Sequence, residues 1–132
     1  MRSARGFTLV ELLVVLAILG LLVALVGPLT ADRLDKARAQ EEWLVLERTV
    51  SGLAFRAFAE GRPVAIDAEG KRLAWRAPGG EEHVLVFRHL FFDPAQAVSI
   101  NANGIAVPAR LLVRRVDRER SLELNRWLED RP

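Results

Sequence analysis

The side chains that could do chemistry in this chain are few and scattered. Two histidines, His83 and His89, lie six residues apart. On one strand this even spacing would put them on the same face but about 20 Å apart, too far to share a metal ion. The carboxylates of Asp67 and Glu69 flank a predicted turn, and Glu129–Asp130 lies near the end of the sequence. There is no cysteine and no Gly-x-Ser-x-Gly nucleophile motif. We therefore predict no catalytic site, no metal site and no cofactor, and expect that the protein is not an enzyme.

One carboxylate, Glu11, stands at the head of a long apolar run. No residue from Leu12 to Ala31 is charged, and Arg2 and Arg5 stand just before the run. As a helix, this run spans about 30 Å, which matches the hydrocarbon core of a bilayer. A carboxylate within a membrane costs on the order of 3 kcal/mol and is rarely kept without a partner. The pattern predicts a membrane-spanning helix in which Glu11 has a specific role.

Two ordinary explanations account for less of this segment. A secretory signal has a shorter apolar stretch and a small-x-small cleavage site, whereas Leu29-Thr30-Ala31 begins with a large residue. A plain anchor for a bitopic periplasmic binding or enzymatic domain explains the length of the run but not Glu11. The plain anchor stays open as an alternative of another functional class.

The segment Gly6-Phe7-Thr8-Leu9-Val10-Glu11-Leu12-Leu13-Val14-Val15 resembles the cleavage and methylation motif of type IV pilins and type II secretion pseudopilins. The resemblance implies that residues 1–6 are a leader, which a prepilin peptidase removes by cutting between Gly6 and Phe7. The new amine of Phe7 would then be N-methylated. Because a carboxylate in an apolar helix bundle needs a nearby cation, Glu11 would pair with the Phe7 amine of a neighbouring subunit in a filament. The alternative is that Glu11 lies shallow and is hydrated at the headgroup level, and this can hold in the free subunit.

Residues 7–31 are predicted to be the transmembrane or filament-core helix, and residues 32–61 its amphipathic continuation. Gly27 and Pro28 predict a kink or local melting within the first part. Gly61-Arg62-Pro63 predicts the end of the helix. We therefore expect a helix from about residue 7 to about residue 60.

The amphipathic part carries one apolar stripe that would face a globular head. Its members recur at three- and four-residue spacing: Trp43, Leu46, Val50, Leu53, Ala54 and Ala57. We predict that Trp43 and Phe58 are core residues.

Residues 62–132 are predicted to form a β-rich periplasmic head. The expected strands are 64–66, 72–76, 83–90 as a central strand ended by Phe91-Phe92-Asp93-Pro94, 98–100, 105–107 and 111–113, the last continuing the sheet. Asn103-Gly104 suits a type I′ turn, and residues 121–128 fit either a strand or a short helix. The fold class is α+β, a long N-terminal helix packed on an antiparallel β-sheet in the pilin-like manner.

The helix exit Arg56-Ala57-Phe58-Ala59-Glu60-Gly61-Arg62-Pro63-Val64 resembles that of the H-type minor pseudopilins, the GspH/FimT-like family. This resemblance implies a structural subunit of the periplasmic pseudopilus of a type II protein secretion system. Its partners would be major and minor pseudopilins, the prepilin peptidase and the inner-membrane secretion platform. It would cross the inner membrane once, with Arg2 and Arg5 on the cytoplasmic side and the head in the periplasm.

An arginine-rich stretch near the C-terminus allows a second interpretation. Arg110, Arg114, Arg115, Arg118 and Arg120 cluster in the sequence, although Asp117 and Glu119 partly neutralise them. A formal net charge of +2 is small for a nucleic-acid-binding protein, so a solvated edge is the simpler explanation. Some FimT-like pilins bind DNA through basic C-terminal residues, so a type IV pilus minor pilin active in DNA uptake is the alternative.

Overall fold

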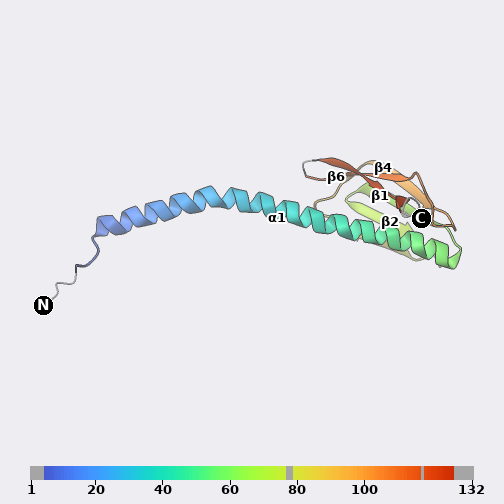
Figure 1. Ribbon diagram of the computed structural model, residues 1–132, viewed down its shortest axis with the longest axis horizontal. Coiled ribbons are helices and arrows are strands. Elements are labelled where there is room, and N and C mark those ends of the chain that lie inside the picture. The colour runs from blue at the N-terminus through green and yellow to red at the C-terminus, as the bar shows by residue number, and fades with distance from the viewer. Residues whose placement is uncertain (1–4, 77–78, 117, 127–132) are drawn as a thin grey trace. The chain divides into compact units, whose positions relative to one another are not determined.

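The computed structural model describes residues 5–76, 79–116 and 118–126. One helix, α1 (Leu9–Glu60), precedes seven strands. These are β1 (Val64–Gly70), β2 (Arg72–Arg76), β3 (Glu82–Val86), β4 (Phe92–Ile100), β5 (Ala106–Val107), β6 (Arg110–Arg114) and β7 (Glu119–Glu123). The chain divides into two compact units, residues 1–35 and residues 36–132 (Figure 1). The α+β class predicted from the sequence is confirmed.

Local backbone chemistry sets both ends of α1. At the start, Thr8 Oγ1 accepts a hydrogen bond from the Glu11 N–H at 3.2 Å, which is the geometry of an N-cap. At the end, Gly61 adopts a φ of 63°, and the Arg62 N–H donates to the Ala57 carbonyl at 3.1 Å. This 6→1 bond with a left-handed glycine is a Schellman motif. The predicted stop after residue 60 is confirmed.

The helix continues through Gly27 and Pro28 without a melted turn. Pro28 has no N–H, so the Ala24 carbonyl loses its usual partner. Nearby, Thr30 Oγ1 donates to the carbonyls of Gly27 at 2.8 Å and Val26 at 3.3 Å. Side-chain bonds of this kind often bend helices, and a kink at this point stays a prediction.

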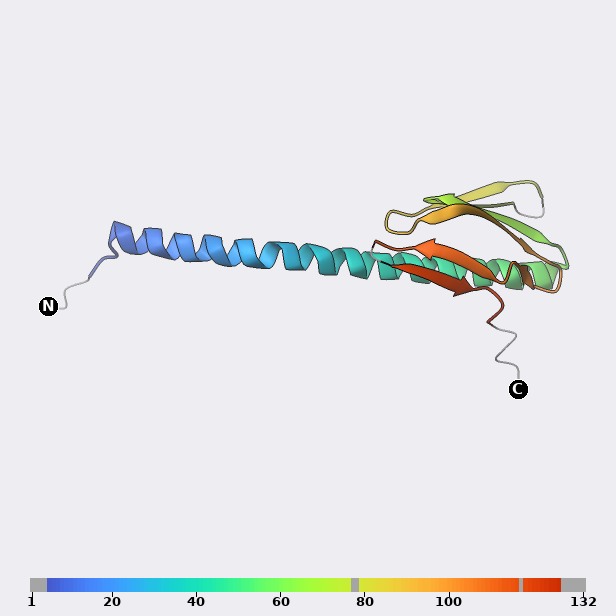
Figure 2. The same ribbon diagram turned by 90° about the horizontal axis from the view of Figure 1, so that it is seen from above.

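The strands of the second unit form two antiparallel sheets. The larger has the order β3-β2-β1-β4-β5, and the smaller is the hairpin β6-β7. Figure 2 shows the two sheets as separate layers within this unit. The register of the central pair β1–β4 places Ile66 opposite Val98 and Val64 opposite Ile100, so that the apolar side chains of both strands share one face.

Four details of the predicted head are wrong. The predicted central strand 83–90 is wrong, since β3 lies at the edge of the large sheet and ends at Val86. Phe87 and Leu90 are buried in the core, but they belong to the loop that follows β3. Phe92 begins β4 rather than ending a strand. Pro94 fits within β4 because the β1–β4 register shifts between Gly70↔Phe92 and Ala68↔Gln96.

The third error concerns residues 111–113, which pair with β7 in the separate small sheet instead of continuing the large one. The fourth concerns the turn between β4 and β5. Asn103 lacks the positive φ that a type I′ turn requires. The Asn101 side chain accepts the N–H groups of Asn103 and Ile105, each at 3.0 Å, and only Gly104 has a positive φ, of 76°. The hairpin of β4 and β5 is present. Of the segment 121–128, for which a strand or a short helix was predicted, residues 121–123 belong to strand β7, and residues 127 and 128 lie outside the described residues.

The core of the second unit lies between the apolar stripe of α1 and the inner faces of both sheets. All six predicted stripe residues are buried, Trp43 with 7% exposure. Phe58 was also predicted as core but is 60% exposed. The reason is rotational, since Phe58 lies one residue, about 100°, beyond Ala57 on the helix and so leaves the stripe.

The first part of α1 is apolar over its whole circumference. An 18-residue window reaches a mean hydropathy of 3.1, with none of it buried inside the chain. By length and composition, this helix is able to cross a membrane. Its side chains therefore need an apolar environment that the rest of the described chain does not provide.

Candidate processing and assembly site

The segment that precedes the helix is exposed and free of steric demands. Gly6 and Phe7 lie outside any regular element, and the Phe7 side chain is 83% exposed. A Cβ atom at Gly6 would meet nothing within 4 Å, and its φ is not in the left-handed region. Among the residues that the structure describes, no steric or backbone requirement explains a glycine at this position.

Glu11 occupies the third helical position, where a carboxylate favours the positive end of the helix dipole. Thr8 and Glu11 have the spacing of a capping box, Ser/Thr-x-x-Glu. The backbone half of that box is present in the Glu11 N–H bond to Thr8 Oγ1. Among the residues that the structure describes, no cation pairs with the Glu11 carboxylate, which is exposed. Capping accounts for part of the role of this residue, and its charge stays available for another partner.

A carboxylate that the sequence analysis did not single out fastens α1 to the loop between β3 and β4. Glu42 accepts hydrogen bonds from the backbone N–H groups of Arg88 at 2.9 Å, His89 at 2.8 Å and Leu90 at 3.2 Å. The His89 Nδ1 atom lies 3.2 Å from Glu42 Oε1. Glu42 lies three residues after the buried Ala39 and four before the buried Leu46, on the side of α1 that faces the head. A charged residue at this position of the apolar stripe was the feature of the sequence that could have indicated a structural role for Glu42.

The pKa of Glu42 reflects two opposed effects. Partial burial raises the pKa by disfavouring the charged form. The hydrogen bonds from the Arg88 and His89 backbone, together with the His89 ring, stabilise the carboxylate and hold its pKa below the usual value. The geometry therefore describes an ionised structural clamp.

The predicted arginine patch is largely engaged within the chain. Arg110 forms an ion pair with Glu123, and Arg114 donates to Asp93 at 3.0 Å. Both arginines lie on the exposed face of β6, where the register also sets Arg114 opposite Glu119. This face therefore carries alternating charge rather than a cluster of free cations.

The remaining arginines point elsewhere. Arg115 is half-buried and donates to Gln40 Oε1 at 3.2 Å. The Arg120 guanidinium lies 5.0 Å from the ring centroid of Trp43, a cation–π contact. Arg118 also has an interaction partner within the chain. The structure does not bring the five side chains together on one surface.

The two histidines are not on one strand face. His83 lies in β3 and stacks on Trp75 with the ring centroids 5.7 Å apart, whereas His89 lies in the loop beside Glu42. In the described ranges, no group of three or more His, Cys, Asp or Glu side chains is placed to hold a metal ion.

Comparison with known proteins finds a family model that matches the N-terminal segment. Residues 1–27 match the family model of the prokaryotic N-terminal methylation motif. A fimbrial protein of Moraxella nonliquefaciens is 32% identical in an alignment of 72 residues, which covers 51% of this chain and 47% of that protein. The matched stretch therefore spans about half the length of this relative. No solved structure matches the chain significantly.

A long apolar N-terminal helix continuing onto an antiparallel sheet, behind a methylation motif, defines a pilin-type architecture. With the fimbrial relative, these features make the chain similar to type IV pilin-like proteins.

Proposed function

We propose that the chain is a minor pseudopilin of the H type, a structural subunit of the periplasmic pseudopilus of a type II secretion system. One observation carries this proposal: the motif Gly6–Glu11 is exposed and leads into a helix whose apolar side chains have no cover within the described chain. In the free subunit, lipid would cover this surface, with Arg5 at the cytoplasmic face and the head in the periplasm. In a filament, the helices of neighbouring subunits would replace the lipid.

A stripe of small residues supports helix packing in the filament. Ala17, Gly20, Ala24, Gly27 and Ala31 recur at three- and four-residue spacing along the apolar part of α1. In helix bundles within membranes, small residues allow backbones to approach closely. A Cβ atom at Gly20 or Gly27 would meet nothing within 4 Å inside this chain. The room along this stripe is therefore available to another helix.

The absence of an internal need for glycine at position 6 supports processing. We expect a prepilin peptidase to require Gly6 and to cut before Phe7, after which the Phe7 amine is methylated. Intact-mass measurement of the membrane-extracted protein should give a chain that begins at N-methyl-Phe7. The variant Gly6→Ala should insert and fold normally but keep its leader, while Gly20→Ala serves as a processed control. A wild-type chain that keeps residues 1–6, or one cut near Ala31, would contradict the proposal.

The fimbrial relative favours a second candidate, a type IV pilus minor pilin. Both candidates share the processing and assembly chemistry, and they differ in the phenotype of a deletion strain. Loss of secreted enzymes from the medium, restored by the wild-type chain, supports the pseudopilin. Loss of piliation or of DNA uptake with normal secretion supports the pilus subunit.

A further inference from the structure

The two edges of the large sheet differ in how they are protected from pairing with another strand. At one edge, β5 is two residues long and is followed by Pro108. The Asn125 side chain also occupies the backbone of this strand, accepting the Ala106 N–H at 2.8 Å and donating to the Ala106 carbonyl at 3.0 Å. Short strands, prolines and covering groups are the usual means by which proteins protect a sheet edge. This edge is therefore closed within the chain.

The opposite edge of the large sheet, strand β3, lacks these protections. It is five residues long and contains neither proline nor lysine, and its one acidic residue is Glu82 at the first position. The side chains of Val84 and Val86, on the outer face of the strand, are 42% and 65% exposed. A strand edge of this length with exposed apolar side chains favours association with a further strand.

The backbone of β3 also directs unpaired polar groups out of the sheet. The β2–β3 register, continued by one residue, sets Phe87 opposite Lys71, and the Phe87 N–H donates to the Lys71 carbonyl at 2.8 Å. Because bonded and non-bonded pairs alternate along an antiparallel ladder, Val84 and Val86 point their N–H and C=O groups away from β2. In the described part of the chain, no hydrogen bond reaches these groups. They are available to pair with another backbone.

The charges at the two ends of this edge are complementary to a second copy of the same edge. Glu82 begins the strand and Arg88 follows its end, and both are exposed and without an ion-pair partner among the described residues. In an antiparallel pair of β3 strands with Leu85 at the two-fold axis, Glu82 lies opposite Arg88 of the second copy. Opposite charges directly across a ladder stabilise the pair, and like charges destabilise it. A register centred on Val84 would instead set Glu82 opposite Val86.

We propose that two copies of this chain associate through their β3 edges, paired antiparallel in the register that sets Glu82 of each copy opposite Arg88 of the other. Val84 of each copy exchanges both backbone hydrogen bonds with Val86 of the other. Leu85, which is partly buried against the core, meets its counterpart on the inner face. The large sheets of the two heads then form one continuous sheet with a two-fold, self-complementary interface. This association goes beyond the proposed function and uses only residues of the second unit.

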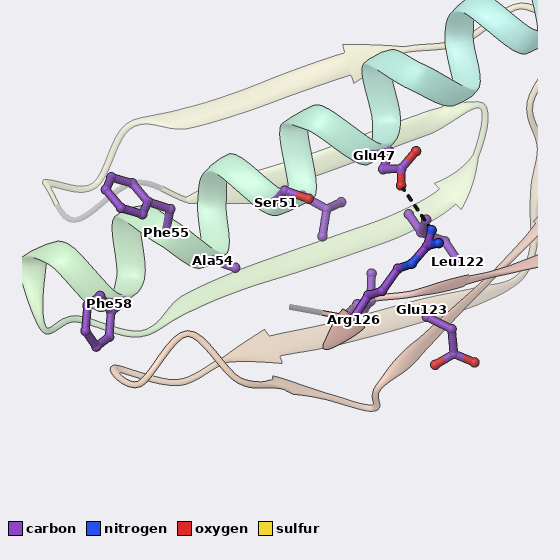
Figure 3. A pocket seen from close by; sticks show the side chains of 10 residues that line it. Glu47, Ser51, Ala54, Phe55, Phe58, Leu122, Glu123 and Arg126 are labelled. Atoms are coloured by element: carbon purple, nitrogen blue, oxygen red, sulfur yellow. Dashed lines mark ion pairs between the residues drawn. The ribbon is translucent and has the colours of Figure 1, made fainter. Parts of the chain in front are cut away.

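A second exposed apolar surface of the head supplies a control. A groove of about 490 Å³ lies between the last turns of α1 and the end of β7, and two of its lining residues, Phe55 and Phe58, are largely exposed (Figure 3). The lining comes from α1, β7 and the residues just after β7, and includes no residue of β3. A substitution in this groove therefore removes exposed apolar surface without changing the β3 edge.

Sedimentation velocity of the full chain tests the association, over a protein concentration series with detergent micelles in excess. The wild type should form dimers that increase with concentration. Val84→Pro removes an outward-facing N–H, which an edge strand tolerates, and should abolish the dimer while leaving the thermal midpoint within a few degrees. Phe58→Ala should leave dimerisation unchanged. A wild type that is monomeric throughout, a dimer that persists in Val84→Pro, or a dimer lost in Phe58→Ala would overturn the proposal.

Charge reversal tests the register without altering the backbone. Glu82→Arg and Arg88→Glu should each raise the dimer dissociation constant several-fold at low salt, because each sets like charges opposite one another. The double variant Glu82→Arg/Arg88→Glu restores opposite charges and should return the constant to within about twofold of the wild type. Failure of the double variant to recover, with thermal midpoints that show all three variants folded, would overturn the proposed register.

Cysteine cross-linking provides an independent test, because the natural sequence has no cysteine. In the proposed register, Val84 of one copy lies opposite Val86 of the other, whereas two Val84 side chains lie on a diagonal of about 7–8 Å. Under mild oxidation, an equal mixture of Val84→Cys and Val86→Cys should therefore form disulfide-linked dimers several-fold faster than either variant alone. Fastest linkage in Val84→Cys alone, or equal rates in all three samples, would overturn the register.

Discussion

The Glu42 carboxylate accepts the His89 backbone N–H at 2.8 Å and also lies 3.2 Å from the His89 ring nitrogen. This relationship joins α1 to a loop 47 residues away in the sequence. Because the same carboxylate serves the neighbouring N–H groups of Arg88 and Leu90, its removal would leave several donors without a partner at once.

Glu42→Ala should therefore reduce the free energy of unfolding by about 2–4 kcal/mol, since part-buried donors lose a charged acceptor. Chemical denaturation of the full chain in micelles, followed by circular dichroism, measures the change. Glu41→Ala, at the adjacent exposed position, should stay within about 0.5 kcal/mol of the wild type. Equal effects of the two substitutions would mean that the clamp contributes little.

The lowered pKa of Glu42 predicts the pH dependence of stability. A carboxyl group whose folded-state pKa is depressed binds its proton more readily in the unfolded chain. Its stabilising contribution is complete above the unfolded value of about 4.3 and is lost as the pH falls through the lower folded value. Glu42→Gln should flatten this acid limb of the midpoint-against-pH curve. A limb unchanged in Glu42→Gln would assign the acid sensitivity to other carboxylates.

Substitutions at Glu11 separate its two roles. Glu11→Gln keeps a side chain suited to the capping box but removes the charge, whereas Glu11→Ala removes both. If Glu11 pairs with the Phe7 amine of a neighbouring subunit, both variants should insert into the membrane and both should be depleted from filaments. Cross-linking of sheared filaments and immunoblotting measure incorporation. Normal incorporation of Glu11→Gln would leave capping as the sole role.

Two glycines in the second unit should respond in opposite directions to alanine. Gly61 holds a φ of 63° at the helix end, so Gly61→Ala should cost about 1–2 kcal/mol. Gly52 lies within α1 in an ordinary conformation with open space around it, so Gly52→Ala should stabilise by about 0.5–1 kcal/mol. The thermal midpoints of the two variants, each compared with that of the wild type, test whether the glycine at the helix end is needed for stability. A stable Gly61→Ala variant would mean that the Schellman bond tolerates another backbone geometry.

The arginine-rich hairpin leads to a prediction on DNA binding. Since Arg110 and Arg114 are paired with carboxylates, the full chain should bind duplex DNA only weakly at physiological salt, as measured by fluorescence anisotropy. Steep salt-dependent binding that disappears in the Arg114→Gln/Arg115→Gln double variant would instead support the DNA-uptake alternative. Arg76→Gln, in the other sheet, is the control for a general change of charge.

Sequence reasoning succeeded where the determining interactions are local. The end of α1 follows from Gly61, and the β1–β2 hairpin follows from alternating apolar residues around Gly70, which has a φ of 57°. Sequence reasoning failed where contacts between residues far apart in the sequence determine the structure. The run 83–90 is apolar because Phe87 and Leu90 fill the core from a loop, and apolar content alone does not distinguish a buried loop from a central strand.

The candidate site divides in the same way. The Gly6–Glu11 motif was visible in the sequence because its meaning depends on neighbouring residues. The Glu42 clamp was not, because its partners are three backbone N–H groups that any residue types could supply. Nor does the spacing of Arg110, Arg114 and Arg120 show that the two strands β6 and β7 turn them to different partners.

The helix begins at Leu9, two residues beyond the proposed scissile bond between Gly6 and Phe7. A protease must hold its substrate in an extended form, and a bond inside a helix becomes accessible only after local unwinding. Here the bond already lies in non-helical backbone, and Thr8 caps the helix on the side that is retained. Removing the leader would thus require no melting of the candidate membrane-spanning helix, and the mature subunit would keep every helical hydrogen bond that it had before the cut.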